Sequence, residues 1–255
     1  MNSVLIYIHR GYCDYMDDVF AITRHYNKET RIILIGDSDN HGIANKYSIE
    51  HHLFSEYNEE IPYHHVSVNP ESYEKFCFSR WFILKNFINR NNIEHFVYSD
   101  SDNMILYDIN SIKYDNAYLG NSQIIVPNIF FCNRDPLNKI CEYYKALFNL
   151  TYGDYFKKIT DSPYIVYYNN NKDMPLFSDM MFLRMAVNEL NISFEKLDDR
   201  NINNPYTYDV NINDIITHIS GNRVYMKNTN TYLLNLHFQG SSKSLTKKYL
   251  SLLQY

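Results

Sequence analysis

The sequence predicts an α/β fold in a single domain, with a Rossmann-like parallel half-sheet that continues into a mixed sheet flanked by helices. Three observations support this fold class. Apolar, β-rich runs alternate with helical segments in the first half of the chain, and shorter strand-like runs follow in the second half. A length of 255 residues, 45% of them hydrophobic, provides enough apolar surface for one large core. We find no internal repeat and no linker, so residues 1–255 are expected to fold as one unit.

The first half of the chain contains the clearest strand–helix units. Its strongest helical signal is the segment from Glu71, in which apolar side chains recur every three or four residues until an Asn-rich turn ends it. The strand and helix patterns predict strands at Ser3–Ile8, Arg31–Ile35, Tyr63–Val68 and Glu94–Ser99, and helices at Tyr15–Tyr26 and Glu71–Asn89.

The second half has shorter elements and a more polar stretch. Asp154–Pro175 is rich in Tyr and Asn, and we expect it to form a surface loop. The remaining patterns predict strands at Ala117–Leu119, Gln123–Cys132, Ile192–Phe194, Ile215–Ile219 and Tyr232–Phe238, and helices at Pro136–Leu150, Met180–Leu190 and Leu245–Leu253.

Composition excludes several classes of partner and location. The net charge is -5 with acidic residues spread along the chain, so we expect no binding to DNA or RNA. The apolar run near the N-terminus is too short for a signal peptide, and no other segment is long enough to span a membrane. The four cysteines form no C-x-x-C pair and are expected to be free thiols in a reducing, cytoplasmic compartment. The sequence leaves the oligomeric state open.

The C-terminal helix is amphipathic and basic. Lys243, Lys247 and Lys248 accompany apolar residues at helical spacing, so this helix could touch an anionic membrane surface. We favour the alternative that its apolar face docks on the domain.

Acidic residues and a glycine follow the predicted parallel strands. Gly11, Asp37–Asp39 and Asp100–Asp102 all fall at the carboxyl edge of the half-sheet, where open α/β sheets bind ligands. Neither G-x-G-x-x-G nor G-x-x-x-x-G-K-[ST] occurs, so a glycine cradle cannot hold the phosphates of a nucleotide. A divalent cation held by carboxylates could do so instead.

Asp100-Ser101-Asp102 has the form of such a cation site. A chain of this composition contains on the order of one D-x-D by chance, and Asp37-Ser38-Asp39 is a second one. A turn or a helix cap is the alternative for either. We favour Asp100 and Asp102 as ligands because a buried strand precedes them and the apolar residues 104–106 follow.

A second motif follows directly after the apolar strand residues Tyr232–Leu236. His237, Gly240 and Lys243 form H-x-x-G-x-x-K, which arises by chance in about two such chains in a hundred. His237 offers an imidazole as a third metal ligand, Gly240 lets the backbone approach an oxyanion, and Lys243 can meet a diphosphate. The alternative is a structural histidine at a strand end, followed by a helix cap.

Together with Arg80 in FSRWFILKNF, these motifs resemble the GT-A-fold glycosyltransferases, and most of all family 8, which includes glycogenin and the bacterial lipopolysaccharide galactosyltransferases. The resemblance covers most of the chain. It implies a UDP-sugar donor, a glycan, glycolipid or glycoprotein acceptor, and transfer with retention of configuration. It also implies that residues 1–106 form the half that binds the nucleotide sugar, and that residues 107–255 form the acceptor half, which carries the C-terminal motif for the metal and the diphosphate.

The same resemblance implies roles for individual residues. Mn²⁺ or Mg²⁺ would be held by Asp100, Asp102 and His237. Asp179 would lie near the anomeric carbon as the catalytic residue, although an N-cap of the helix from Met180 is its alternative role. The donor would be contacted by Arg80, Asp100, Ser101, Gly240 and Lys243, and Tyr12 or Tyr15 would stack on its base.

Departures from the family pattern indicate a divergent subgroup. Ser244-Leu245 stands where the family has Pro-Trp, Pro127-Asn128 replaces its Asn-Ser-Gly stretch, and only Ser178-Asp179-Met180 represents its Asp-Gln loop. Two other functions stay open: a sugar-nucleotidyltransferase, for which the loop His9–Tyr12 is too short, and a non-catalytic nucleotide-sugar-binding protein. Trp81, beside Arg80, is expected in the core.

Overall fold

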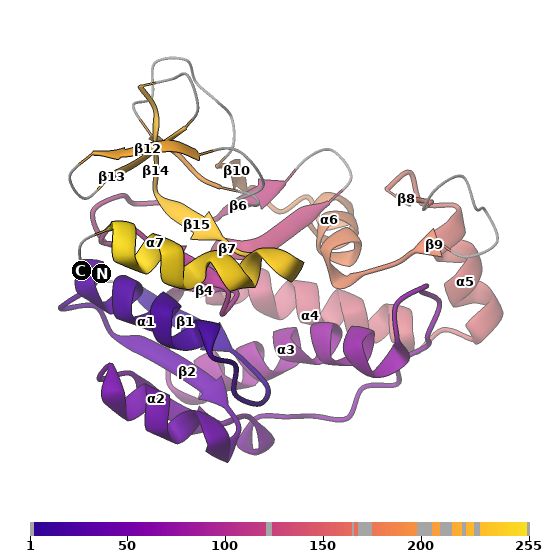
Figure 1. Ribbon diagram of the computed structural model, residues 1–255. Coiled ribbons are helices and arrows are strands. Elements are labelled where there is room, and N and C mark those ends of the chain that lie inside the picture. Colours follow the sequence, from indigo (N-terminus) through magenta and orange to yellow (C-terminus); the bar gives the residue numbers. More distant parts are fainter. Residues whose placement is uncertain are drawn as a thin grey trace.

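Seven strands form the central sheet, in the order β10-β6-β7-β4-β1-β2-β3 (Figure 1). The computed structural model describes residues 3–120, 124–164, 166–167, 175–197, 206–209, 216–220, 223–226 and 230–253. The strands of this sheet are β1 (Val4–Ile8), β2 (Ile32–Gly36), β3 (Glu50–Leu53), β4 (His95–Ser99), β6 (Ala117–Gly120), β7 (Ile125–Asn133) and β10 (Glu195–Lys196).

The sheet is parallel in one half and mixed in the other. β1 lies parallel to β2 and β4, and β2 lies parallel to β3. β7 then pairs antiparallel with both β4 and β6, whereas β10 is parallel to β6. The predicted parallel half-sheet with a mixed continuation is therefore confirmed.

Among the described residues, three smaller sheets lie outside the central one. The first has the order β11-β14-β13-β12, and the other two are the pairs β15-β5 and β8-β9. Their strands are β5 (Asn103–Ile105), β8 (Val166–Tyr167), β9 (Pro175–Leu176), β11 (Tyr206–Thr207), β12 (Ile216–Ser220), β13 (Arg223–Met226), β14 (Tyr232–Leu233) and β15 (Asn235–His237).

Helices cover both faces of the central sheet (Figure 1). The α-helices are α1 (Tyr15–Tyr26), α2 (His41–Lys46), α3 (Glu71–Arg90), α4 (Arg134–Phe148), α5 (Tyr152–Thr160), α6 (Asp179–Glu189) and α7 (Thr246–Leu252). Short 3-10 helices occur at Ser38–Asn40, Phe54–Glu56 and Gly240–Leu245.

The alternation of side chains along β1 divides the core into two layers. Ile6 and Ile8 pack with α3, α4, α5 and α6 on one face. Leu5 and Tyr7 pack with α1, α2 and α7 on the other. Because both faces are covered there, the inner parallel strands β1, β2 and β4 are largely apolar and can be recognised in the sequence as continuous apolar runs.

Two predicted strands were wrong. Residues 63–68 form no strand, and the third parallel strand is β3, whose sequence EHHL is polar. β3 lies at the edge of the sheet, where its side chains are half-buried or exposed, so it lacks the apolar run used to find strands. Residues 192–194 are also not a strand, and the short β10 follows them.

The predicted surface loop at 154–175 was wrong in its first part. α5 begins at Tyr152, and its N-cap Thr151 accepts a hydrogen bond from the backbone N–H of Asp154. Tyr155 and Ile159 are buried against the aromatic core. The polar composition therefore belongs to the exposed face of an amphipathic helix, and residues 165 and 168–174 lie outside the described residues.

The predicted C-terminal helix docks on the domain. The Thr246 hydroxyl donates to Oδ2 of Asp18 on α1 over 2.7 Å, and Tyr249 and Leu253 are buried. In Figure 1, α7 runs beside α1. Membrane contact through this helix stays a prediction. Among the described residues, no helix is both long and apolar enough to cross a membrane.

Candidate functional site

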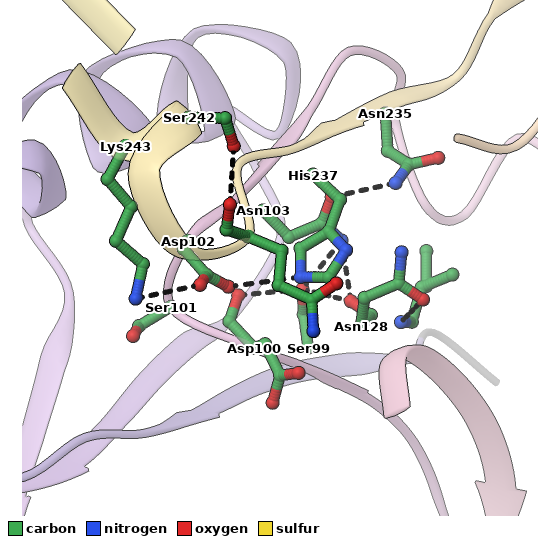
Figure 2. A network of polar contacts seen from close by, with 12 residues as sticks. Ser99, Asp100, Ser101, Asp102, Asn103, Asn128, Asn235, His237, Ser242 and Lys243 are labelled. Carbon is green, nitrogen blue, oxygen red and sulfur yellow. Dashed lines mark hydrogen bonds and ion pairs between the residues drawn. The ribbon is translucent and has the colours of Figure 1, made fainter. Parts of the chain in front are cut away.

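Two segments far apart in the sequence meet at the carboxyl edge of the parallel half-sheet. Asp100 and Asp102 follow β4, and His237 ends β15. β15 pairs antiparallel with β5, which places His237 opposite Asn103. The ladder continues past the strand end, because the backbone N–H of Phe238 donates to the carbonyl of Asp102 over 2.8 Å. The two motifs singled out in the sequence therefore lie side by side (Figure 2).

Asp100, Asp102 and His237 could hold a metal ion. One potential ligand atom from each of the three lies within 4.8 Å of the others, and no second such group of His, Cys, Asp or Glu occurs among the described residues. His237 Nε2 lies 3.3 Å from Asp102 Oδ1, and Lys243 Nζ lies 3.1 Å from Asp102 Oδ2. The side chains are 21% (Asp100), 13% (Asp102) and 4% (His237) exposed, so solvent reaches the group from one side.

The two carboxylates have different electrostatic surroundings. Burial raises the pKa of Asp100, and the Arg80 guanidinium only partly offsets this effect. Burial would also raise the pKa of Asp102, but His237 and Lys243 together lower it below its usual value. Both carboxylates therefore face positive charge, but only at Asp102 do the neighbouring basic residues outweigh the effect of burial.

Three buried asparagines connect the strands beneath this group through hydrogen bonds. Asn103 Nδ2 donates to the Asn128 carbonyl over 2.5 Å, and Asn235 Nδ2 donates to Asn103 Oδ1 over 2.7 Å (Figure 2). All three side chains are fully buried. The backbone N–H of His237 donates to Oδ2 of the buried Asp209 over 2.9 Å. Sequence reasoning missed these residues because asparagine is common throughout the chain.

Arg80 connects the metal group to Asp179. Its Nη1 donates to Asp100 Oδ1 over 2.9 Å, while Nε and Nη2 donate to Asp179 Oδ2 over 3.1 and 2.5 Å. The Tyr98 hydroxyl donates to the same oxygen of Asp100 over 2.9 Å. The alternative role of Asp179 as an N-cap is not observed, since Ser178 is the N-cap and Asp179 is the first residue of α6.

Trp81 is fully buried, as predicted for a core residue. Its indole nitrogen also donates to Asp179, a polar role that the sequence did not indicate.

The metal group, Arg80 and Asp179 line a cleft of about 350 Å³. A volume of this size is within the range of ligand pockets. The cleft brings together the following predicted site residues: Arg80, Asp100, Asp102, Asp179, His237, Gly240 and Lys243. Gly240 has φ +61°, in the left-handed region that favours glycine, and a Cβ there would meet no atom within 4 Å.

Tyr12, Tyr15 and Ser101 lie outside the lining of this cleft. The Tyr15 ring faces Lys243, whose Nζ lies 4.8 Å from the ring centre, and the Tyr15 hydroxyl is 3.4 Å from Ser101 Oγ. Ser101 Oγ also lies 2.7 Å from His9 Nδ1, and burial lowers the pKa of His9 to about 4. Tyr12 is 50% exposed. Tyr15 thus contacts two of the predicted site residues, Lys243 and Ser101, whereas Tyr12 is an exposed residue that does not line the cleft.

The second D-x-D serves as a turn. Asp37 and Asn40 form a capping box on the short helix Ser38–Asn40, and Asp37 Oδ2 accepts the backbone N–H of Gly11 over 2.6 Å. Asp39 is exposed. Cys13, Cys77, Cys132 and Cys141 are all free thiols, as expected.

No family model matches the sequence, and no curated protein matches it. Solved structures of glycosyltransferases are similar in fold. Mouse xyloside xylosyltransferase 1, in its apo form, matches with a TM-score of 0.51 and 8% identity over 78% of this chain and 85% of that chain. A glycosyltransferase involved in the glycosylation of the major capsid of PBCV-1 has a TM-score of 0.43 and 11% identity, over 96% and 99% of the two chains. The PaToxG glycosyltransferase has a TM-score of 0.40 and 13% identity, over 74% and 70%.

At these identities the similarity concerns the fold. The chain has a GT-A-like mixed α/β fold, with a largely parallel central sheet between two layers of helices. Membership of family 8 stays a prediction.

Proposed function

We propose that the protein is a metal-dependent glycosyltransferase that moves a sugar from a UDP-sugar to a glycan, glycolipid or glycoprotein acceptor. The observation that carries the proposal is the group Asp100–Asp102–His237 with Lys243 beside it, at the edge where α/β sheets bind ligands. A GT-A-like fold supports this function without specifying it, because one fold hosts many activities.

The residues of the group fit a divalent cation such as Mn²⁺ or Mg²⁺. Carboxylate oxygens and a neutral imidazole suit these ions. Asp100 Oδ1 accepts from both Arg80 and Tyr98, and Oδ2 takes no hydrogen bond from the described residues. That oxygen, one oxygen of Asp102 and a ring nitrogen of His237 would hold the ion. Bound there, it would offset the charge that develops on a diphosphate leaving group.

The protein's own residues supply the rest of the proposed chemistry. Lys243 would neutralise negative charge on the departing diphosphate, and the open backbone at Gly240 would let a phosphate oxygen approach. Ser101 and Tyr15 would form the side of the site that faces the nucleoside, with Tyr12 as the alternative stacking residue. Residues 1–106 would form the donor half and 107–255 the acceptor half, which also carries the C-terminal motif for the metal and the diphosphate, in a cytoplasmic enzyme.

Asp179 is the residue that we propose to act at the sugar. All its hydrogen bonds with described residues engage Oδ2, which leaves Oδ1 for the substrate. Arg80 holds the carboxylate, so Asp179 would present a fixed negative charge to the positive charge that develops on the sugar as its bond to phosphate breaks. This role matches transfer with retention. In an inverting reaction the carboxylate would take the proton of the acceptor hydroxyl instead.

Calorimetry with UDP, GDP and CDP, each with and without Mn²⁺, tests the proposal. We expect Mn²⁺-dependent binding of UDP to the wild type and its loss in Asp102→Asn. The matched control is Asp39→Asn, an exposed aspartate in the other D-x-D, which should bind like the wild type. Absence of binding by all three nucleotides in the presence of Mn²⁺ would overturn the proposed function.

A further inference from the structure

The cleft continues beyond Arg80 to a buried carboxyl group that the proposed function does not use. Glu74 lies on the first turns of α3 and is 1% exposed, yet it lines the cleft together with Asn69. Its Oε1 accepts a hydrogen bond from Asn69 Nδ2, whereas Oε2 is buried and has no partner among the described residues. A buried polar atom without a partner is costly, so this oxygen is suited to receive a group from a ligand.

The surroundings of Glu74 allow its carboxyl group to be protonated or ionised near neutral pH. Burial raises its pKa to about 7, and Asp179 on α6 adds to this effect, while Asn69, Arg80 and His65 oppose it. A sugar hydroxyl both donates and accepts hydrogen bonds, so it can pair with the unpartnered Oε2 whether the carboxyl group is protonated or ionised.

The position of Glu74 along α3 relates it to the metal group. Arg80 lies six residues further along the helix, about 9 Å along its axis, and it contacts both Asp100 and Asp179. The cleft therefore runs from Lys243 and the metal group, past Arg80, to Glu74. A diphosphate at the Lys243 end would place its attached sugar beside Arg80, with the outer hydroxyls of that sugar directed along α3.

We propose that Glu74, oriented by Asn69, binds a hydroxyl group of the transferred sugar and thereby determines which donor sugars the enzyme accepts. This inference rests on the proposed function. The depth of Glu74 favours the donor sugar over the acceptor, because the acceptor must approach from solvent. A site built to bond a hydroxyl discriminates strongly against sugars that lack or misplace it, since its buried group is then left unpaired.

The test compares Glu74→Met, which removes both carboxyl oxygens, with the wild type. Glu71→Met is the matched control, since Glu71 lies one turn earlier on α3 and is exposed. With Mn²⁺ present, the dissociation constants of UDP, UDP-glucose, UDP-galactose, UDP-N-acetylglucosamine and UDP-xylose are measured, together with the hydrolysis rate of each UDP-sugar. The sugar-free UDP serves as the probe of the metal and diphosphate end alone.

We expect Glu74→Met to weaken binding of the preferred UDP-sugar about ten- to hundredfold, to reduce the differences among the sugars, and to leave UDP binding within about twofold. Unchanged preference among the sugars, or an equal loss for UDP itself, would overturn this inference. If UDP fails to bind even the wild type, it is the proposed function that is overturned.

Discussion

The indole nitrogen of Trp81 donates a hydrogen bond of 3.0 Å to Oδ2 of Asp179, the oxygen that also accepts two bonds from Arg80. Two consecutive residues of α3 thus hold one carboxylate at the start of α6. The Asp179 side chain is 3% exposed, so its charge is compensated almost entirely by these partners and by the N-terminal end of its helix. Its orientation is fixed before any substrate arrives.

Arg80→Gln should destabilise the protein by roughly 3–5 kcal/mol, because it leaves the buried carboxylate of Asp179 without its cation. Arg31→Gln is the control, since the Arg31–Glu50 pair is 44% and 38% exposed and should cost about 1 kcal/mol or less. Urea unfolding of both variants measures the difference. Equal losses would show that the Arg80 pair is not effectively buried.

Gly36→Ala and Gly42→Ala should have effects of opposite sign. A Cβ at Gly36 would come within 2.1 Å of Asn40 Oδ1 and displace that buried side chain, which bonds Asp37 N and the Gly11 carbonyl. We expect a loss of about 2 kcal/mol. Gly42 lies in α2 with no atom near its Cβ position, so alanine should stabilise the helix by about 0.5–1 kcal/mol. Thermal unfolding of both variants measures these changes in stability. A destabilised Gly42→Ala would contradict the helix at His41–Lys46.

Glu74 should make the protein less stable as the pH rises. The folded protein holds this proton more tightly than the unfolded chain, with a pKa of about 7 against 4.5. The stabilising contribution is therefore complete below pH 4.5 and is lost between pH 4.5 and 7. Glu74→Gln should exceed the wild type by about 3 kcal/mol in the free energy of unfolding at pH 8 and gain nothing from this source at pH 4. Denaturant titrations at pH 4 and pH 8 measure this difference in stability. A difference that does not depend on pH would refute the raised pKa of Glu74.

Lys243→Met should separate metal binding from diphosphate binding. Without Lys243, Asp102 loses a cation at 3.1 Å, so Mn²⁺ alone should bind several-fold more tightly. UDP in the presence of Mn²⁺ should bind about tenfold more weakly, because a charged hydrogen-bond donor is lost. Lys247→Met, on the exposed side of α7, is the control and should change neither constant. Loss of both affinities together would indicate a structural role for Lys243.

The sequence was most informative where a motif follows an apolar strand. Asp100 and Asp102 after β4, and His237 at the end of the run that forms β14 and β15, could be found because buried strands have a clear pattern and their ends mark a sheet edge. The structure brings these residues into one cleft with Arg80 and Asp179. Their chemical roles stay predictions.

Features that depend on tertiary packing could not be predicted. Glu74 is buried because of what packs around the start of α3, and its spacing on the helix resembles that of any surface glutamate. The polar strand β3 and the helix α5 are equally invisible to a search for apolar runs, since neighbours in the fold supply their context. The bond between Asn103 and Asn235 joins residues whose identities carry no signal of the pairing.

That bond has a consequence for biosynthesis. Asn103 and Asn235 are 132 residues apart, so a growing polypeptide on the ribosome exposes the aspartate pair on the order of ten seconds before its histidine partner is made. Until then the nascent chain has the acidic side chains of Asp100 and Asp102 close together, without the basic residues His237 and Lys243 of the second motif. β15 can therefore join β5 only after the whole intervening chain has been made, and the group Asp100–Asp102–His237 is incomplete until that strand has joined.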